Sequence, residues 1–264
     1  MIEDHYWSTT KPPAGVEIPA SVEIVSTTRR GGVSSAPYDT LNLGTHVGDD
    51  PSAVRKNRRL LRVSSAEKPE FCWLTQVHGI DVVDAAQVPG VESVEADASF
   101  TRTANVACAV MTADCLPVLL FDRLGTVVAA AHAGWRGLVA GVVEETIDAM
   151  AVEPAELVAL LGPAIGPDTF EVGDEVRQAF VEADSGADAC FRPSPFHPEQ
   201  RWVADLYELC RRRLRAVGIG QVVGGDACTF SDEERFYSYR RDGQTGRMAS
   251  AIWLRRNVRK CPDR

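Results

Sequence analysis

The sequence has few histidines and no clustered cysteine motif. Its 264 residues include five His and seven Cys. The cysteines form no Cys-x-x-Cys pair, and their number is odd. We therefore expect no disulfide framework, and a reducing cytoplasm as the location, because disulfide-built proteins are typical of oxidising compartments.

Membrane and targeting signals are also missing. No run of about 18 apolar residues could span a bilayer. The first ten residues, MIEDHYWSTT, have no basic region followed by an apolar core, so we expect no signal peptide. The formal net charge of −9 disfavours sequence-independent binding to nucleic acid or to an anionic membrane. No obligate protein partner is evident.

The composition is that of an ordinary globular protein, with 45% hydrophobic and 25% charged residues. The length allows one large domain or two small ones. We find no internal repeat, low-complexity tract or clean linker, and we expect one domain over residues 1–264. Predicted strands often follow one another directly, so strict βαβ alternation does not fit. The pattern favours an α+β fold with mixed sheets covered by helices.

Apolar periodicity and turn residues predict the elements. Asp50 and Pro51 provide an N-cap and a first-turn proline for one helix. Residues 184–200 contain three Pro and predict a flexible loop, and residues 86–104 predict a loop with a short strand. Helices are expected at 50–62, 138–150, from about 173 to 183, and 205–216. Strands are expected at 22–29, 71–76, 80–85, 105–111, 116–121, 126–131, 156–162, near 202, and at 221–225, 235–241 and 250–256.

The segment 105–137 carries the most chemistry. Two apolar runs lie on either side of the turn Asp122-Arg123-Leu124-Gly125, and a third precedes them. The runs lead into Asp114-Cys115 and His132-Ala133-Gly134, residues that core packing does not require. Reactive side chains at the ends of rigid strands hold their geometry better than those on free loops.

His78, Cys115 and His132 share one property, since each stands where a predicted strand breaks into a polar or Gly-containing turn. Two imidazoles and one thiolate make a three-ligand set for Zn²⁺, with the fourth position left for water or substrate. Their spacing is too long for a short diagnostic motif. A Cys–His nucleophile pair and a buried structural cysteine with hydrogen-bonded histidines therefore stay open as alternatives.

Several longer motifs make the interpretation more specific, because together they resemble the laccase-domain family. This family is also called the YfiH-like or peptidoglycan-editing-factor family. The matching motifs cover roughly residues 22–256 in the order that the family has. They are Arg30-Gly31-Gly32-Val33-Ser34, Leu41-Asn42-Leu43-Gly44, Thr75-Gln76-Val77-His78-Gly79, Thr112-Ala113-Asp114-Cys115, His132-Ala133-Gly134-Trp135-Arg136-Gly137, Gly162-Pro163-Ala164-Ile165-Gly166, Phe170-Glu171-Val172-Gly173, Tyr239-Arg240-Arg241-Asp242-Gly243 and Gly246-Arg247-Met248.

The resemblance implies a single α+β domain in which two mixed β-sheets pack together between helices, an α/β/β/α sandwich. It implies a metal, usually zinc, at His78, Cys115 and His132. It also implies phosphorolysis of purine nucleosides (adenosine, inosine, methylthioadenosine) and deamination of adenosine. Older descriptions of the family are multicopper polyphenol oxidase and cysteine hydrolase, and editing of peptidoglycan precursors is attributed to bacterial members.

Phosphorolysis requires a group that holds phosphate near the ribose. Arg58, on the predicted helix beside the Asn42 loop, is our first candidate, followed by Arg30 with the Gly31-Gly32 turn. Phe170 could provide a flat slot for the base. We also assign Asn42 and Gln76, which stand in the matching motifs, to substrate binding.

The histidine count bears on the alternatives. A multicopper oxidase needs roughly ten His, commonly in His-x-His pairs, because its copper sites draw on imidazole and thiolate. Five widely separated His cannot supply them, although copper at the same three ligands could give weak oxidation. A binding module with a structural zinc would normally show four protein ligands, and only three present themselves.

Overall fold

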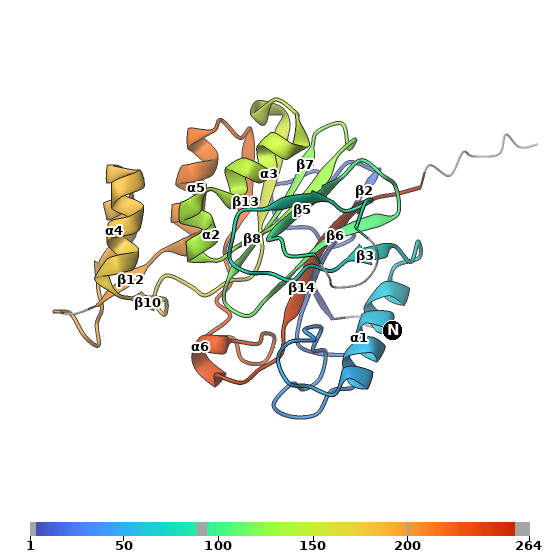
Figure 1. The fold of residues 1–264 in the computed structure, drawn as a ribbon, viewed down its shortest axis with the longest axis horizontal. Helices are drawn as coiled ribbons and strands as arrows, with labels where there is room; N and C mark the ends of the chain where they lie inside the picture. Colours follow the sequence, from blue (N-terminus) through green and yellow to red (C-terminus); the bar gives the residue numbers. More distant parts are fainter. Residues whose placement is uncertain (1–3, 89–93, 200, 257–264) are drawn as a thin grey trace, which may run out of the picture.

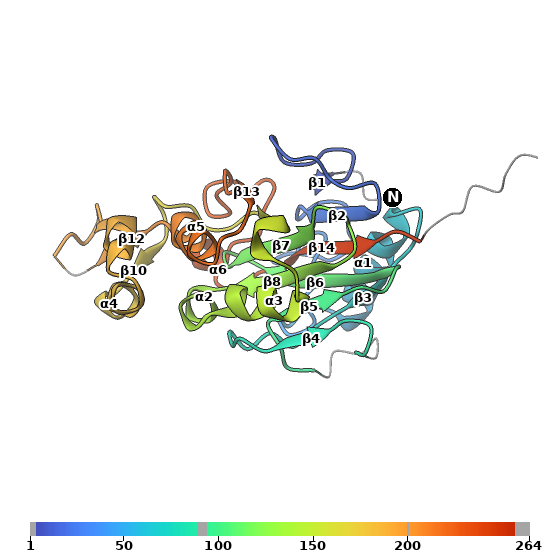
Figure 2. The same cartoon turned by 90° about the horizontal axis from the view of Figure 1, so that it is seen from above.

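The computed structural model describes residues 4–88, 94–199 and 201–256. Its centre is a pair of mixed sheets packed face to face (Figures 1 and 2). The first sheet has the order β1-β2-β14-β6-β3, and all its pairs are antiparallel except β3 with β6. Its strands are β1 (His5–Ser8), β2 (Val22–Thr27), β14 (Met248–Leu254), β6 (Val106–Thr112) and β3 (Glu70–Cys72).

The second sheet has the order β13-β9-β7-β8-β5-β4, with parallel pairs at both edges and antiparallel pairs between them. Its strands are β13 (Gln221–Gly224), β9 (Leu157–Leu161), β7 (Leu116–Asp122), β8 (Val128–Ala133), β5 (Ala98–Thr101) and β4 (Val82–Asp84). The hairpin of β7 and β8 at its centre corresponds to the two apolar runs around the Asp122–Gly125 turn.

Alternation of side chains along the strands divides the interior into layers. On β7, Leu119 and Phe121 pack between the two sheets, whereas Val118 and Leu120 face the helices. The outer face of the second sheet is covered by α2 (Trp135–Ala140), α3 (Val142–Met150) and α5 (Leu206–Ala216). The outer face of the first sheet is covered by α1 (Pro51–Ser64), whose Leu61 packs there. This confirms the expected α+β sandwich with helices on both sides.

A small third sheet was not predicted. It has the order β10-β12-β11 and extends, with α4 (Asp174–Ala183), from one end of the sandwich (Figure 2). Its strands are β10 (Glu171–Val172), β12 (Trp202–Ala204) and β11 (Phe191–Pro193). Two 3-10 helices occupy Pro154–Glu156 and the six residues Ser185–Cys190.

Three predictions of local structure were wrong. The strand expected at 235–241 is instead irregular chain followed by the short helix α6 (Tyr239–Asp242), which begins because the Ser238 hydroxyl accepts a bond from the Arg241 N–H. The single helix expected at 138–150 is divided at Gly141, whose φ of 111° no α-helix allows. Most of the loop expected at 184–200 is ordered, since the Asp184 carboxylate caps the 3-10 helix and Phe191 packs on Phe180.

The helix expected at 50–62 is confirmed as α1, and its N-cap is Asp50, whose carboxylate accepts a bond from the Ser52 N–H. Parts of two predicted loops, residues 89–93 and 200, lie outside the described residues. Within the ranges that the structure covers, no helix is long and apolar enough to cross a membrane.

Candidate metal centre

The β7–β8 hairpin brings two of the three candidate ligands together. Cys115 directly precedes β7, and His132 lies next to the last residue of β8, where it is paired with Pro117. His132 shares its strand face with Val128 and Ala130, which pack between the sheets. The hairpin therefore directs the His132 side chain into the end of the space between the two sheets, where it is 3% exposed.

His78 reaches the same place from the connection between β3 and β4, which leads from one sheet to the other. Its φ is 62°, a left-handed conformation that turns the chain sharply. The Cys115 Sγ lies 3.8 Å from His78 Nε2, and the ring centroids of His78 and His132 are 4.9 Å apart. One ligand atom from each residue lies within 4.8 Å of the others. The three residues thus converge as a His-Cys-His group that suggests a metal site.

Asp97 holds this arrangement, and sequence reasoning missed it. Its carboxylate is fully buried and accepts a 2.7 Å hydrogen bond from His132 Nδ1. It also accepts the backbone N–H groups of the turn around His78, at 3.1, 3.0 and 2.7 Å from Val77, His78 and Gly79. A carboxylate between Ala96 and Ala98 at the start of a short strand was the available signal. Such a buried charge needs partners, and here they are two of the candidate ligands.

The electrostatics of the group favour the ligand form of its sulfur. Burial would raise the pKa of the Cys115 thiol, but the imidazoles of His132 and His78 oppose burial and lower this pKa to about 6. Burial would lower the pKa of His132, whereas Cys115 and Asp97 raise it to about 9. The sulfur is thus predisposed to the thiolate form, which is the form that binds metal.

Two glycines leave space for the candidate ligands. A Cβ atom on Gly134 would lie 2.9 Å from His78 Cδ2 and 3.0 Å from Cys115 Sγ. A Cβ on Gly137 would lie 2.8 Å from the Gly79 carbonyl oxygen. These two positions of the motif that follows β8 therefore let the start of α2 approach the ligands closely.

The turn before Cys115 is tied to the C-terminal part of the chain. Asp114, which has a φ of 95°, accepts a 2.6 Å bond from the Thr229 hydroxyl and a 2.7 Å bond from the Arg240 N–H. The Asp114 carboxylate therefore links the turn before Cys115 to α6. Within the described part of the chain, the structure shows no hydrogen bond between this carboxylate and His78 or His132.

Two of the predicted substrate residues are occupied by contacts within the fold. Asn42 is fully buried, and its amide bonds with Gly44, Asp49 and the Arg247 N–H. Gln76 forms a pair of hydrogen bonds with the backbone of Met111, at 2.9 and 2.7 Å. Both residues shape the loops around the centre, and their contact with substrate stays a prediction.

The other predicted substrate residues also have defined surroundings. Arg58 donates through Nε and Nη2 to the Leu43 carbonyl, at 2.9 and 2.6 Å, and lies 4.1 Å above the Trp73 ring. Arg30 is paired with Glu234 at 3.1 Å, and the N–H of Gly32 in the neighbouring turn donates to Thr40.

Phe170 is 8% exposed and packs in the core beneath α4 and α5. The structure does not bring Arg30 or Phe170 into the His-Cys-His group through any contact among the described residues. Their substrate roles, like that of Arg58, stay predictions.

Comparison with known proteins agrees with these motifs. The family model described as multi-copper polyphenol oxidoreductase laccase matches residues 23–255. This chain belongs to that family. A Neisseria meningitidis protein of solved structure is 51% identical, with a TM-score of 0.88 over 92% of this chain and 98% of that one.

Relatives in this laccase family have been named for an activity. A purine nucleoside phosphorylase of Pseudomonas aeruginosa is 55% identical over 94% of this chain and 98% of its own length. The YfiH purine nucleoside phosphorylase of Escherichia coli is 53% identical over 89% and 95%. The Bacillus licheniformis YfiH structure has 30% identity and a TM-score of 0.80. The likeness to these relatives spans the whole sandwich.

Proposed function

We propose that this protein is a zinc-dependent purine nucleoside enzyme. In its main reaction a phosphate oxygen bonds to ribose C1′ of inosine, adenosine or methylthioadenosine, the C1′–N9 bond breaks, and the protonated base leaves. In a second reaction water adds at adenine C6 and ammonia leaves. The observation that carries the proposal is the convergence of His78, Cys115 and His132, supported by relatives that bear the name purine nucleoside phosphorylase.

The donor set fits zinc. Two imidazoles and one thiolate are the ligand types that Zn²⁺ prefers, and three protein ligands leave one position for a reactant, as in catalytic sites. Because the Asp97 carboxylate can only accept, Nδ1 of His132 carries a proton, and Nε2 is the nitrogen that would bind a metal after giving up its own proton. When bound, zinc would lower the pKa of a water molecule to near neutral pH. It would also polarise an oxygen of the substrate.

The family description as a copper oxidase does not fit the ligand inventory. Among the residues that the structure describes, His78, Cys115 and His132 form the one group of three or more candidate ligands that converges. Coupled copper sites need several such groups. Copper bound at these three ligands would give at most one ion per chain.

A metal-free Cys–His hydrolase is the second candidate, because Cys115 Sγ lies 3.8 Å from His78 Nε2, close to the reach of a nucleophile and its base. Such an enzyme could act on peptidoglycan precursors. It differs from our proposal in that the Cys115 sulfur would attack the substrate itself and no metal would be needed.

The test combines metal analysis with two assays, phosphate-dependent inosine cleavage and adenosine deamination. We expect one metal per chain in the wild type, with ligand distances near ~2.3 Å for sulfur and ~2.0–2.1 Å for nitrogen if it is zinc. Cys115→Ser should lose metal and both activities. Cys228→Ser is the matched control, since this partly buried cysteine lies outside the group. Full activity after chelation to below ~0.1 metal per chain would contradict the proposal and favour the hydrolase.

A further inference from the structure

A cavity of about 330 Å³ lies beside α6 and is absent from the sequence-based assignment of the site. One side is the loop of His46 and Val47, and the other is α6 with the residues that follow it. Its lining residues are His46, Val47, Tyr239, Gly243, Gln244, Thr245 and Arg247.

Arg247 is held in this cavity along its whole length. Its backbone N–H donates to Asn42 Oδ1 at 2.9 Å, and its methylenes pack so closely on Gly44 that a Cβ there would lie 2.8 Å from Arg247 Cγ. One nitrogen, Nη1, donates to the carbonyl oxygens of Thr245 and Gly246, both at 3.0 Å. Among the described residues, Nε and Nη2 have no hydrogen-bond partner and no carboxylate pairs with the guanidinium. One edge of a fixed arginine fork is therefore available to a ligand.

Two observations place this cavity beside the metal centre. Asp114, the neighbour of Cys115, accepts the N–H of Arg240, and Arg240 follows the cavity residue Tyr239. In addition, burial lowers the pKa of Arg247, while the charges of Cys115 and Asp114 oppose that effect, so these groups lie within electrostatic reach of the guanidinium. An anion bound by Arg247 would thus be near the His-Cys-His group.

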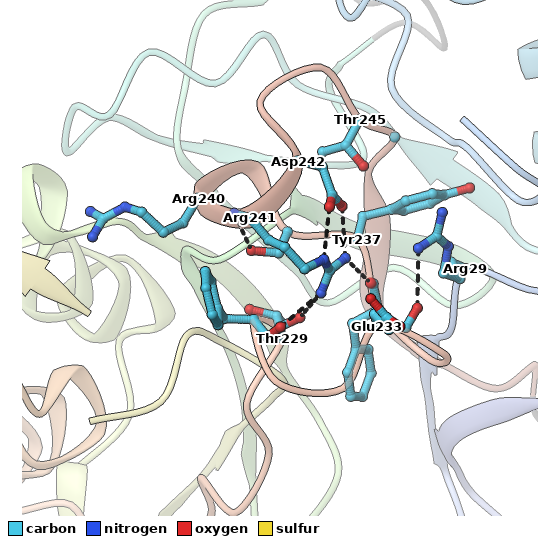
Figure 3. A network of polar contacts seen from close by, with 12 residues as sticks. Arg29, Thr229, Glu233, Tyr237, Arg240, Arg241, Asp242 and Thr245 are labelled. Carbon is cyan, nitrogen blue, oxygen red and sulfur yellow. Dashed lines mark hydrogen bonds and ion pairs between the residues drawn. The ribbon is translucent and has the colours of Figure 1, made fainter. Parts of the chain in front are cut away.

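A network of hydrogen bonds holds α6 on one side of the cavity. Arg241 of α6 donates through Nη1 to the carbonyls of Thr229 and Phe230 and through Nη2 to that of Phe236, and it pairs with Asp242 (Figure 3). The side chain that points out of this network is that of the neighbouring Arg240. These bonds hold the segment 229–242 together, and this segment leads directly into the cavity residues 243–247.

We propose that Arg247 holds the phosphate that attacks ribose C1′, an inference that rests on the proposed phosphorolysis. A planar guanidinium with a free edge matches two oxygens of a phosphate. Arg58, the candidate from sequence, directs both Nε and Nη2 at the Leu43 carbonyl and stacks on Trp73, so it fixes the loop before Gly44. Arg247 therefore binds the anion, whereas Arg58 positions the loop on which Arg247 packs.

The test is the dependence of inosine cleavage on phosphate concentration. Arg247→Ala should raise the KM for phosphate about 10- to 150-fold, the loss expected for one charged hydrogen-bonding group, while the KM for inosine changes less than about 2-fold. Arg247→Lys should recover part of the loss because it keeps the charge without the fork. Arg59→Ala, on the exposed face of α1, is the control and should leave both constants unchanged.

A second readout separates binding from activity. Inorganic phosphate should raise the melting temperature of the wild type and of Arg59→Ala, and this shift should disappear in Arg247→Ala and shrink in Arg247→Lys. If the wild type does not cleave inosine in phosphate, the proposed function fails. If it does, and the phosphate KM and the melting shift of Arg247→Lys and Arg247→Ala equal those of the wild type, the assignment of Arg247 is overturned. If the KM for phosphate rises only in Arg58→Ala, phosphate binding would be assigned to Arg58 instead.

Discussion

Asp97→Asn should weaken metal binding although Asp97 is not expected to touch the metal. Oδ1 accepts from His132 Nδ1 and the His78 N–H, and Oδ2 accepts from the N–H groups of Val77 and Gly79. An asparagine keeps one acceptor oxygen and places an NH₂ group against the other two donors. One pair of bonds is therefore lost whichever way the amide turns.

The magnitude follows from the lost contacts. Each bond to a charged acceptor contributes about 1.5–3 kcal/mol, so the pair amounts to roughly 3–6 kcal/mol before the site relaxes. Part of this loss destabilises the fold, and part releases the two histidines. Loss of such a supporting carboxylate typically reduces metal affinity about 10- to 100-fold. We expect a reduction in this range together with a lower melting temperature.

The assay is competition for zinc against a chromophoric chelator, with urea unfolding measured in parallel. Asp122→Asn is the matched control, because this buried carboxylate accepts the N–H groups of Thr126 and Val127 at the other end of the same hairpin. It should lower stability by about 1–3 kcal/mol and leave zinc affinity unchanged. Unchanged zinc affinity in Asp97→Asn, or an equal loss in Asp122→Asn, would refute the role that we give to Asp97.

Three further outcomes are expected. Gly134→Ala should lower zinc affinity about tenfold or more with little loss of stability, because its new Cβ would crowd His78 and Cys115. Gly173→Ala is the control, since the atoms that its Cβ would crowd are the flexible end of the Glu175 side chain. Equal zinc affinity in both variants would contradict the steric argument. Copper-loaded protein should bind about one ion per chain and lack the intense blue band and the coupled trinuclear signal, and four coppers per chain would reverse our interpretation. Cys115→Ser should impair deamination at least as strongly as inosine cleavage, because the proposed deamination depends wholly on a water activated at the metal. Both rates are measured on one preparation, and a loss confined to inosine cleavage would contradict this prediction.

The apolar pattern of the sequence predicted an α+β fold with mixed sheets covered by helices, whereas the two-sheet sandwich was expected from the family resemblance. The runs that became β6, β7 and β8 were located to within a few residues, and Asp50-Pro51 marked the start of α1. The strand expected at 235–241 failed because buried aromatic residues there do not alternate. Phe236 and Tyr237 are adjacent and both fully buried, which reflects tertiary packing rather than a pleated strand.

The candidate ligands could be identified because strand ends that carry His or Cys have a recognisable pattern. The support of the site could not, since it depends on which distant segments meet. Asp97 lies beside His132 only because β5 pairs with β8. The surroundings of Arg247 exist only because the Asn42–Gly44 loop folds over it. Conversely, the sequence could not reveal that the amides of Asn42 and Gln76 are used within the fold.

The position of β14 constrains how the protein can be made in a cell. β14 lies between β2 and β6 in the first sheet, and residues 248–254 are synthesised long after both neighbours. Until then β2 and β6 each present an open edge of unpaired backbone groups, which can pair with another nascent chain. The first sheet can close only after translation has passed Leu254, so a ribosome that stalls or terminates earlier would release an aggregation-prone chain that already contains His78, Cys115 and His132 but lacks the strand that joins β2 to β6.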